Sequence, residues 1–181
     1  MEPFLHITLH QPCIPNNTGT IGRLCVATGC ALHLIHPIGF DTSEKACRRA
    51  GLDYWPRLRV CEHADWEAYL RDSGATEERL WLFSARRGLP VWEATFSPGD
   101  HLVFGGETQG LPQQLLDRYE QRTLRLPLAP GERSINVACA AAAGLFEAMR
   151  QLRGVWERRI AAALGKEAGG EASKGYHRGH G

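Results

Sequence analysis

The sequence predicts a single α/β domain whose sheet is mostly parallel. Short apolar runs typical of strands alternate along the chain with helical patterns, and this alternation is typical of a sheet buried on both faces. The 181 residues are 43% hydrophobic and 23% charged, which is enough apolar content for a buried core and argues against a disordered chain.

Prolines and glycines mark where several of the expected strands and helices end. Strands are expected at residues 4–9, 31–35, 58–61, 80–83, 101–104 and 123–126. Helices are expected from Asn17 or Thr18 to residue 28 and at 44–50, 65–71, 115–119 and 134–153, the last with Ser134 in the N-cap position. We therefore expect the folded domain to span residues 1–156.

The cysteines and the hydropathy pattern indicate a cytoplasmic protein. We read Cys13, Cys25, Cys30, Cys47, Cys61 and Cys139 as reduced thiols, because a chain of this size does not need disulfides for stability. Their spacing matches no common zinc site, so no metal is expected. The sequence contains neither a secretory signal pattern nor an apolar run of about 18 residues, so we expect no membrane attachment.

The C-terminal segment differs in composition from the rest of the chain. Residues 157–181 hold five basic and three acidic residues, a net charge of +2, and the stretch after Leu164 is rich in glycine. Such a sequence buries too little surface to offset its ordering entropy. We expect the end of a helix followed by a disordered basic tail.

Three segments combine glycines with polar residues where a strand ends and a helix begins. The first is Asn17-Thr18-Gly19-Thr20-Ile21-Gly22-Arg23, the second Phe104-Gly105-Gly106-Glu107-Thr108-Gln109-Gly110-Leu111-Pro112, and the third runs from Leu126 through Arg133, Ser134 and Asn136 to Val137. The carboxyl ends of strands in open α/β sheets are where ligands bind. Each segment taken alone also fits an ordinary capped helix or glycine turn.

A run of small residues, Ala138 to Gly144 interrupted by Cys139, opens the last expected helix. Small side chains allow another backbone to approach closely. Tight packing on the sheet and docking of a loop, a cofactor or a second subunit both account for this run.

Taken together and in this order, the three segments resemble the motifs of the SPOUT family of RNA methyltransferases. One group within this family, the small tRNA (cytidine(34)-2′-O)-methyltransferases, is indicated by a further resemblance in the stretch Arg48-Arg49-Ala50-Gly51-Leu52-Asp53-Tyr54. The resemblance covers about residues 4–153. It implies a trefoil knot in the last part of the domain and a tight homodimer.

The resemblance also implies a cofactor and a set of site residues. S-adenosylmethionine would be held in the knot by Phe83, Gly105, Leu126 and Ser134, with Asn17, Glu107 and Asn136 as additional candidates. A side chain at Gly105 would then collide with the cofactor while leaving the fold intact. Arg23 would be the catalytic residue and would reach the cofactor of the other subunit. Arginine is hardly ever neutral in proteins, so phosphate binding and alkoxide stabilisation suit Arg23 better than a general-base role.

The implied activity is methylation of the ribose 2′-hydroxyl at the wobble nucleotide 34, a cytidine or modified uridine, in tRNAs of the leucine type. Methylation at tRNA position 32 or in ribosomal RNA is an alternative within the same class. A non-catalytic RNA-binding module and a nucleotide-binding oxidoreductase are the alternatives outside it.

Overall fold

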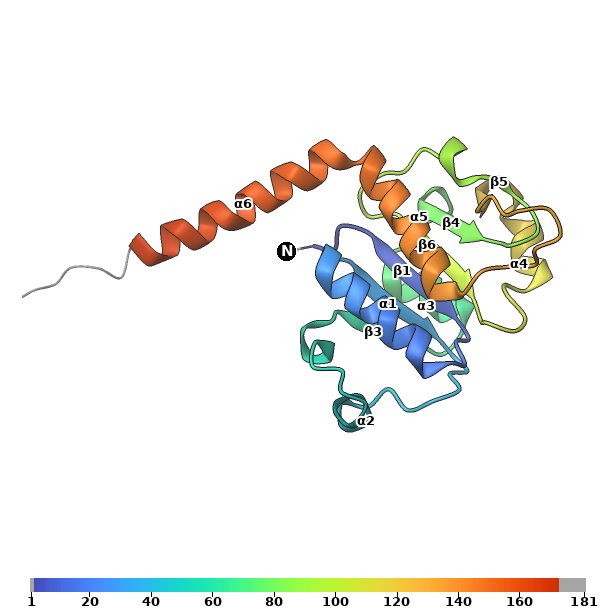
Figure 1. Cartoon of the computed structure of the whole chain (residues 1–181), viewed down its shortest axis with the longest axis horizontal. Helices are drawn as coiled ribbons and strands as arrows, with labels where there is room; N and C mark the ends of the chain where they lie inside the picture. The colour runs from blue at the N-terminus through green and yellow to red at the C-terminus, as the bar shows by residue number, and fades with distance from the viewer. Residues whose placement is uncertain (1, 173–181) are drawn as a thin grey trace, which may run out of the picture.

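The computed structural model describes residues 2–172, which form one α/β domain with a projecting helix (Figure 1). Seven strands form one sheet in the order β3-β2-β1-β6-β4-β7-β5, and every pairing is parallel. The strands are β1 His6–His10, β2 Ala31–Ile35, β3 Val60–His63, β4 Leu80–Phe83, β5 Leu89–Pro90, β6 His101–Gly105 and β7 Thr123–Arg125. This sheet confirms the predicted α/β class.

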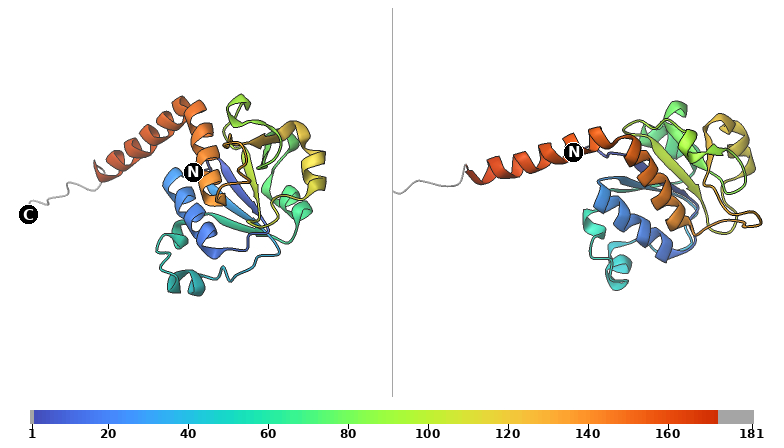
Figure 2. Two further views of the ribbon diagram at one scale, coloured as in Figure 1. Left: turned by 45° about the vertical axis from the view of Figure 1, so that its right-hand side comes forward. Right: turned by 45° about the horizontal axis from the view of Figure 1, so that its top comes forward.

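Helices cover both faces of the sheet (Figure 2). They are α1 Pro15–Thr28, α2 Glu44–Arg49, α3 Trp66–Ser73, α4 Gln113–Arg118, α5 Val137–Gln151 and α6 Arg153–Ala172. In β6, Leu102 and Phe104 pack with α1 and α5, whereas Val103 points to the face that α3 and α4 cover. The alternation along each strand thus produces two apolar clusters with the sheet between them. Among residues 2–172, none of the helices is long and apolar enough to cross a membrane.

Helix α1, which contains the first motif, and helix α5, which follows the third, do not begin at the residues that the sequence predicted. Helix α1 begins at Pro15, whose fixed φ suits the first helical position, rather than at Asn17 or Thr18. Helix α5 begins at Val137, and Asn136, not Ser134, is its N-cap. The side chain of Asn136 accepts hydrogen bonds from the amides of Ala138 (2.8 Å) and Cys139 (3.3 Å).

Strand β7 lies between β4 and β5, although these two strands are joined by residues 84–88 alone. The amide of Ser84 donates to the carbonyl of Leu124 (2.9 Å), and Nε of Arg125 donates to the carbonyl of Gly88 (3.1 Å). The connection is therefore held against the inserted strand at both ends. This arrangement accords with the threaded chain that the family resemblance implied, and the trefoil knot itself stays a prediction.

The small residues of α5 allow the helix to lie close to the sheet. A Cβ atom at Gly144 would come within 2.7 Å of the Phe83 ring. Ala141 and Ala148 lie on the same side of the helix and are fully buried. The run of alanines therefore includes a contact surface for the sheet.

Helix α6 continues to Ala172 and projects away from the body of the domain (Figure 1, Figure 2). The helix thus extends eight residues beyond Leu164, into the segment that the sequence analysis assigned to the tail. The disorder of the tail stays a prediction. Residues 173–181 lie outside the described part of the chain. Only the first turns of α6 pack on the core, where the ring of Trp156 lies 5.2 Å from that of Phe4.

A chain ended after Leu164 should keep its thermal stability, its oligomeric state and its affinity for S-adenosylmethionine. The reason is that Trp156 remains, while Ile160 and Leu164 are already 41% and 61% exposed. Differential scanning calorimetry, light scattering and isothermal titration check the three properties. Loss of soluble protein on this truncation would mean that the distal part of α6 stabilises the domain.

Candidate active site

Three of the four predicted cofactor residues lie together at the carboxyl edge of the sheet. Phe83 is the last residue of β4, Gly105 the last of β6, and Leu126 directly follows β7. These strands are neighbours in the order β6-β4-β7, and Phe83 is paired with Phe104 on one side and Leu124 on the other. Ser134 lies in the exposed loop that leads from this edge to α5.

The glycines after β6 are required by the protein's own backbone. A Cβ atom at Gly105 would collide with the backbone of Gly110 and Leu111, and one at Gly106 would come within 2.6 Å of the Gln11 carbonyl. The amide of Gly110 donates to the carbonyl of Gly106 (2.9 Å), which closes the turn. A side chain at Gly105 therefore meets the protein itself before it meets a ligand, and the expectation that such a variant keeps its fold is wrong.

Gly105→Val should lower the free energy of unfolding by about 3 kcal/mol or more, because backbone cannot move aside as a flexible side chain can. Cofactor binding should be lost as a consequence of the distorted turn. Urea unfolding measures the first effect and isothermal titration the second. Gly154→Ala is the matched control, since a Cβ atom there meets only the end of the Arg158 side chain at 3.5 Å. A Gly105→Val protein as stable as the control would contradict this account.

The three additional candidates, Asn17, Glu107 and Asn136, form one hydrogen-bonded chain between the three motifs. The Asn17 amide donates to Oε1 of Glu107 (2.9 Å), and the Asn136 amide donates to Oδ1 of Asn17 (2.9 Å). Glu107 also accepts from the backbone amides of Cys13 (3.0 Å) and Ile14 (3.2 Å). Segments that lie 90 and 119 residues apart in sequence are thereby held together.

The carboxyl group of Glu107 is kept ionised by this network. Partial burial favours the neutral acid, but the hydrogen bonds from Cys13 and Asn17 outweigh burial and hold the pKa of Glu107 below its ordinary value. An ionised Glu107 can only accept hydrogen bonds, and this fixes the amide of Asn17 with its nitrogen toward the carboxylate. The network therefore has a defined orientation at neutral pH.

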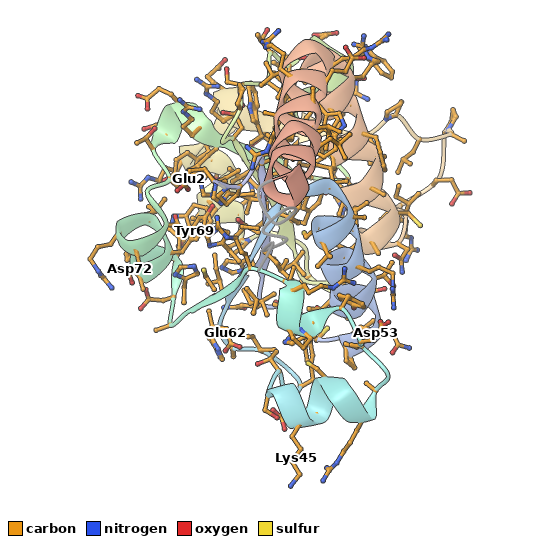
Figure 3. The ribbon with its side chains drawn as sticks, turned by 90° about the vertical axis from the view of Figure 1, so that its left-hand side faces the viewer. Glu2, Lys45, Asp53, Glu62, Tyr69 and Asp72 are labelled. Atoms are coloured by element: carbon orange, nitrogen blue, oxygen red, sulfur yellow. The ribbon has the colours of Figure 1, made fainter. Side chains whose placement is uncertain are left out.

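The structure does not bring Arg23 to the predicted cofactor residues of its own chain. Arg23 lies six residues after Asn17 on α1, which places it about 9 Å further along the helix and on a different side. Its guanidinium lies 3.1 Å from the Asp53 carboxylate and 4.3 Å from the centre of the Tyr54 ring. The side chain is 60% exposed. Figure 3 shows Asp53 in the region between α1 and α2.

The position of Arg23 is set by close packing of α1 on the segment around Tyr54. The hydroxyl group of buried Tyr54 donates to the carbonyl of Gly19. A Cβ atom at Gly22 would come within 3.0 Å of Leu58, so only glycine fits there without a shift. A cavity of about 450 Å³ opens beside Arg23, between α1, the segment 40–42 and the segment 46–55.

Histidines of β1, β2, β3 and β6 form a cluster that the sequence did not predict. Nδ1 of His6 lies 2.9 Å from Nε2 of His33, and Nδ1 of His33 lies 2.9 Å from Nε2 of His63. The Thr8 hydroxyl donates to the Tyr69 oxygen (3.0 Å), which leaves the Tyr69 hydroxyl to donate to His101 (2.8 Å). The register that sets His6 beside His101 brings the cluster together, and no motif in the sequence reports it.

Burial keeps these imidazoles neutral. Burial lowers the pKa of His6 to about 4, and burial together with the neighbouring histidines lowers the pKa of His33 to about 3 and that of His101 to about 2. The ring nitrogens of these three residues lie within 4.8 Å of one another, a spacing that a metal ion could use. The rings of His6 and His101, however, are stacked 4.1 Å apart and within 9° of parallel. One ion cannot lie in both ring planes, so we read the cluster as a neutral hydrogen-bonded network.

The residues at the carboxyl edge fit a nucleoside cofactor. Leu126 is half-buried and leaves apolar surface at this edge, whereas Phe83 is buried and packs beneath it against Gly144. Three strand ends with a glycine turn supply backbone amides and carbonyls. A small number of fixed polar groups in apolar surroundings is the usual composition of a cofactor site.

An all-parallel sheet with motif loops at this edge is the arrangement that the resemblance to SPOUT methyltransferases implied. A family model described as the SpoU rRNA Methylase family matches residues 4–146. The chain belongs to this family, and S-adenosylmethionine is the family's methyl donor. The family membership confirms the resemblance that the motifs indicated.

Individual members of the family are similar to this chain over most of its length. The chain is 45% identical over 148 residues to the tRNA (cytidine(34)-2'-O)-methyltransferase of Saccharophagus degradans, a match that covers 81% of this chain and 95% of that protein. A solved structure that concerns the 2-OH methylation of C/U34 on tRNA is 43% identical, with a TM-score of 0.75, over 83% of this chain and 97% of that one. An AdoMet-bound rRNA methyltransferase from Sinorhizobium meliloti is 26% identical, with a TM-score of 0.71, over 84% of this chain and 58% of that one.

Proposed function

We propose that this protein transfers a methyl group from S-adenosylmethionine to the ribose 2′-hydroxyl of nucleotide 34 in tRNA. The observation that carries the proposal is the match over 81% of this chain and 95% of a tRNA (cytidine(34)-2'-O)-methyltransferase. The family match over residues 4–146 includes all three motif segments. Since tRNA is the substrate, we place the enzyme in the cytoplasm.

Phe83, Gly105, Leu126 and Ser134 are the residues that we assign to the cofactor, whose sulfonium methyl group is already a strong electrophile. No metal ion is needed to activate it. The protein therefore has to align the ribose hydroxyl with the methyl carbon, and positioning of this kind can lower a barrier by roughly 7–11 kcal/mol. The Asn17–Glu107–Asn136 network holds the three motif segments in the required arrangement.

Arg23 acts on the RNA. A guanidinium binds phosphate through two parallel hydrogen bonds, and a fixed positive charge stabilises the alkoxide that develops on the 2′-oxygen. The proton leaves to the adjacent phosphate or to water, because arginine does not accept it at neutral pH.

The active unit in this proposal is a homodimer. Arg23 is separated from the cofactor residues of its own chain, so a second chain has to bring its Arg23 to them. Ile135, in the loop between the cofactor edge and α5, and Phe146 on α5 are 43% and 55% exposed, and they supply apolar surface for a second chain. These observations support a shared site between two subunits.

The direct test is mass-spectrometric nucleoside mapping of tRNA and of ribosomal RNA, each incubated with the purified protein and S-adenosylmethionine. A 2′-O-methylated nucleotide 34 supports the proposal. Methylation at position 32 or in ribosomal RNA only would assign another substrate, and RNA binding without methyl transfer would make the chain an RNA-binding module.

Heterodimers of two inactive variants test the shared site. Leu126→Trp fills the cofactor site and Arg23→Ala removes the RNA contact, so each homodimer should be inactive. A purified heterodimer, co-expressed with two tags, should have about half of the wild-type activity, because one of its two sites combines an intact cofactor site with an intact arginine. A folded but inactive heterodimer would mean that Arg23 serves its own chain.

A further inference from the structure

The cavity beside Arg23 has the composition of a site for a flat ring. Phe40, Leu52 and Trp55 form apolar walls, and Ala46 and Ala50 contribute small side chains. Its volume of about 450 Å³ lies within the range of roughly 300–1000 Å³ that is usual for small-molecule sites. Phe40 is only half-buried, so part of its side chain remains free for a ligand.

Arg23 lines the same cavity and already faces an anion. The Asp53 carboxylate, 78% exposed, lies 3.1 Å from the guanidinium, and the Tyr54 ring supports its other face. A phosphate group suits the position of this carboxylate, because both anions accept hydrogen bonds from the planar guanidinium. A nucleotide whose phosphate displaces Asp53 would have its base within reach of the cavity.

Several polar groups of the cavity wall are occupied, whereas the buried hydroxyl of Thr18 has no hydrogen-bond partner among the described residues. The hydroxyl groups of Thr20, Thr42 and Tyr54 donate to Asn16, Glu62 and Gly19 respectively. Asp41 uses one carboxylate oxygen to accept from the amide of Ser43 (2.8 Å). The Ser43 side chain also donates to this carboxylate. A carboxylate has about four acceptor positions, so Asp41 can still accept from an amino group, as acidic side chains do when they bind the N4 amino group of cytosine.

We propose that this cavity receives the base of the nucleotide whose ribose is methylated, with Phe40 against the ring and the phosphate on Arg23. The inference rests on the proposed function and adds the site that holds the base. Proteins that recognise single-stranded RNA commonly turn a base out of its stack and place it on an aromatic side chain. Such stacking changes affinity by roughly five- to hundredfold when the aromatic residue is replaced by alanine.

A comparison of two RNAs tests the inference. One is an anticodon stem-loop with an intact nucleotide 34, and the other has the ribose but no base at that position. Wild type should methylate the intact RNA with a kcat/KM at least roughly fivefold higher than the abasic one. Phe40→Ala should lower kcat/KM on the intact RNA to a similar extent and leave the abasic RNA within about twofold of wild type. Phe40→Leu should retain part of the lost activity.

Equal losses on both RNAs would overturn the inference, because Phe40 would then act without contact to the base. Trp92→Ala, which removes an aromatic side chain that is 56% exposed elsewhere on the domain, is the matched control and should change neither RNA. Thermal melting of each variant shows whether the fold is retained.

A binding measurement separates this inference from the proposed function. A stem-loop with 2′-deoxycytidine at position 34 accepts no methyl group, and its Kd is measured by fluorescence anisotropy with the cofactor-loaded protein. Wild type should bind this RNA more tightly than its abasic copy, and Phe40→Ala should remove the difference. Equal affinities in wild type would overturn the base site even if methylation occurs, whereas a difference without methyl transfer would overturn only the proposed reaction.

Asp41 supplies a specificity test at the same site. Asp41→Asn should lower kcat/KM for a stem-loop with cytidine at position 34 more than for one with uridine, because only cytosine has the amino group. Equal effects on the two RNAs would remove Asp41 from the base site.

Discussion

Replacing Arg23 with alanine should lower kcat by about two to three orders of magnitude, the usual effect of removing one charge-stabilising donor from an active site. The affinity for S-adenosylmethionine should stay within about twofold of wild type, because Arg23 lies apart from the cofactor residues of its own chain. Arg23→Lys should recover only part of the activity, since lysine keeps the charge but loses the planar fork that also stacks on Tyr54.

Single-turnover kinetics and isothermal titration measure these two effects separately. The matched control is Arg71→Ala on α3, an arginine that is 68% exposed and pairs with the adjacent Asp72. A fully active Arg23→Ala enzyme would remove Arg23 from the reaction. Loss of cofactor binding in this variant would instead place Arg23 in the cofactor site.

Acidification should destabilise the protein steeply between pH 6.5 and about pH 4. In the unfolded chain His6, His33 and His101 take up protons near pH 6.5, whereas in the folded protein their pKa values are about 4, 3 and 2. The folded state therefore binds fewer protons, so the stability is present above pH 6.5 and is lost as the pH falls. For each histidine that stays neutral in the folded protein, the free energy of unfolding falls by roughly 1.4 kcal/mol per pH unit below pH 6.5.

Over the three histidines this loss is a substantial part of the roughly 5–15 kcal/mol that stabilises an ordinary domain. Urea unfolding at a series of pH values measures the slope. His6→Gln keeps a hydrogen-bonding side chain in the cluster but does not titrate, so its slope should be shallower by about one proton. His36→Gln is the control, because His36 lies at the surface with a 43% exposed side chain beside Glu62. A stability that does not change between pH 7 and pH 5 would mean that the cluster takes up protons without unfolding.

The sequence predicted the long strands and helices because each has its own apolar pattern. Strand β5 was missed because Leu89–Pro90 is two residues long and contains a proline, and only its pairing with β7 makes it a strand. The start of α5 was displaced by two residues because Ser134 and Asn136 are both good N-caps. In the structure Asn136 is the N-cap, and its side chain also donates a hydrogen bond to Asn17, a tertiary contact that the local sequence does not reveal.

The sequence predicted candidate residues of the site from its motifs. It did not predict contacts between residues that only the folded chain brings together. The family resemblance named Phe83, Gly105 and Leu126, and the structure places them at one edge because β4, β6 and β7 are parallel and end there. Their role in cofactor binding stays a prediction. The chain of hydrogen bonds through Glu107 and the histidine cluster depend on the register between strands far apart in sequence. The cavity beside Arg23 likewise requires α1 to pack against a segment some 30 residues later.

The insertion of β7 between β4 and β5 has a consequence for biosynthesis. A ribosome releases β4, residues 84–88 and β5 before β7, so the sheet cannot be completed in the order in which its strands are made. The space for β7 has to stay open until residues 123–125 have emerged, and such non-local pairing is intrinsically slow. Leu126 comes directly after this last strand, and Ser134 follows in the loop to α5. On the proposed assignment of the cofactor residues, a nascent chain acquires its complete cofactor site only when this final strand is in place.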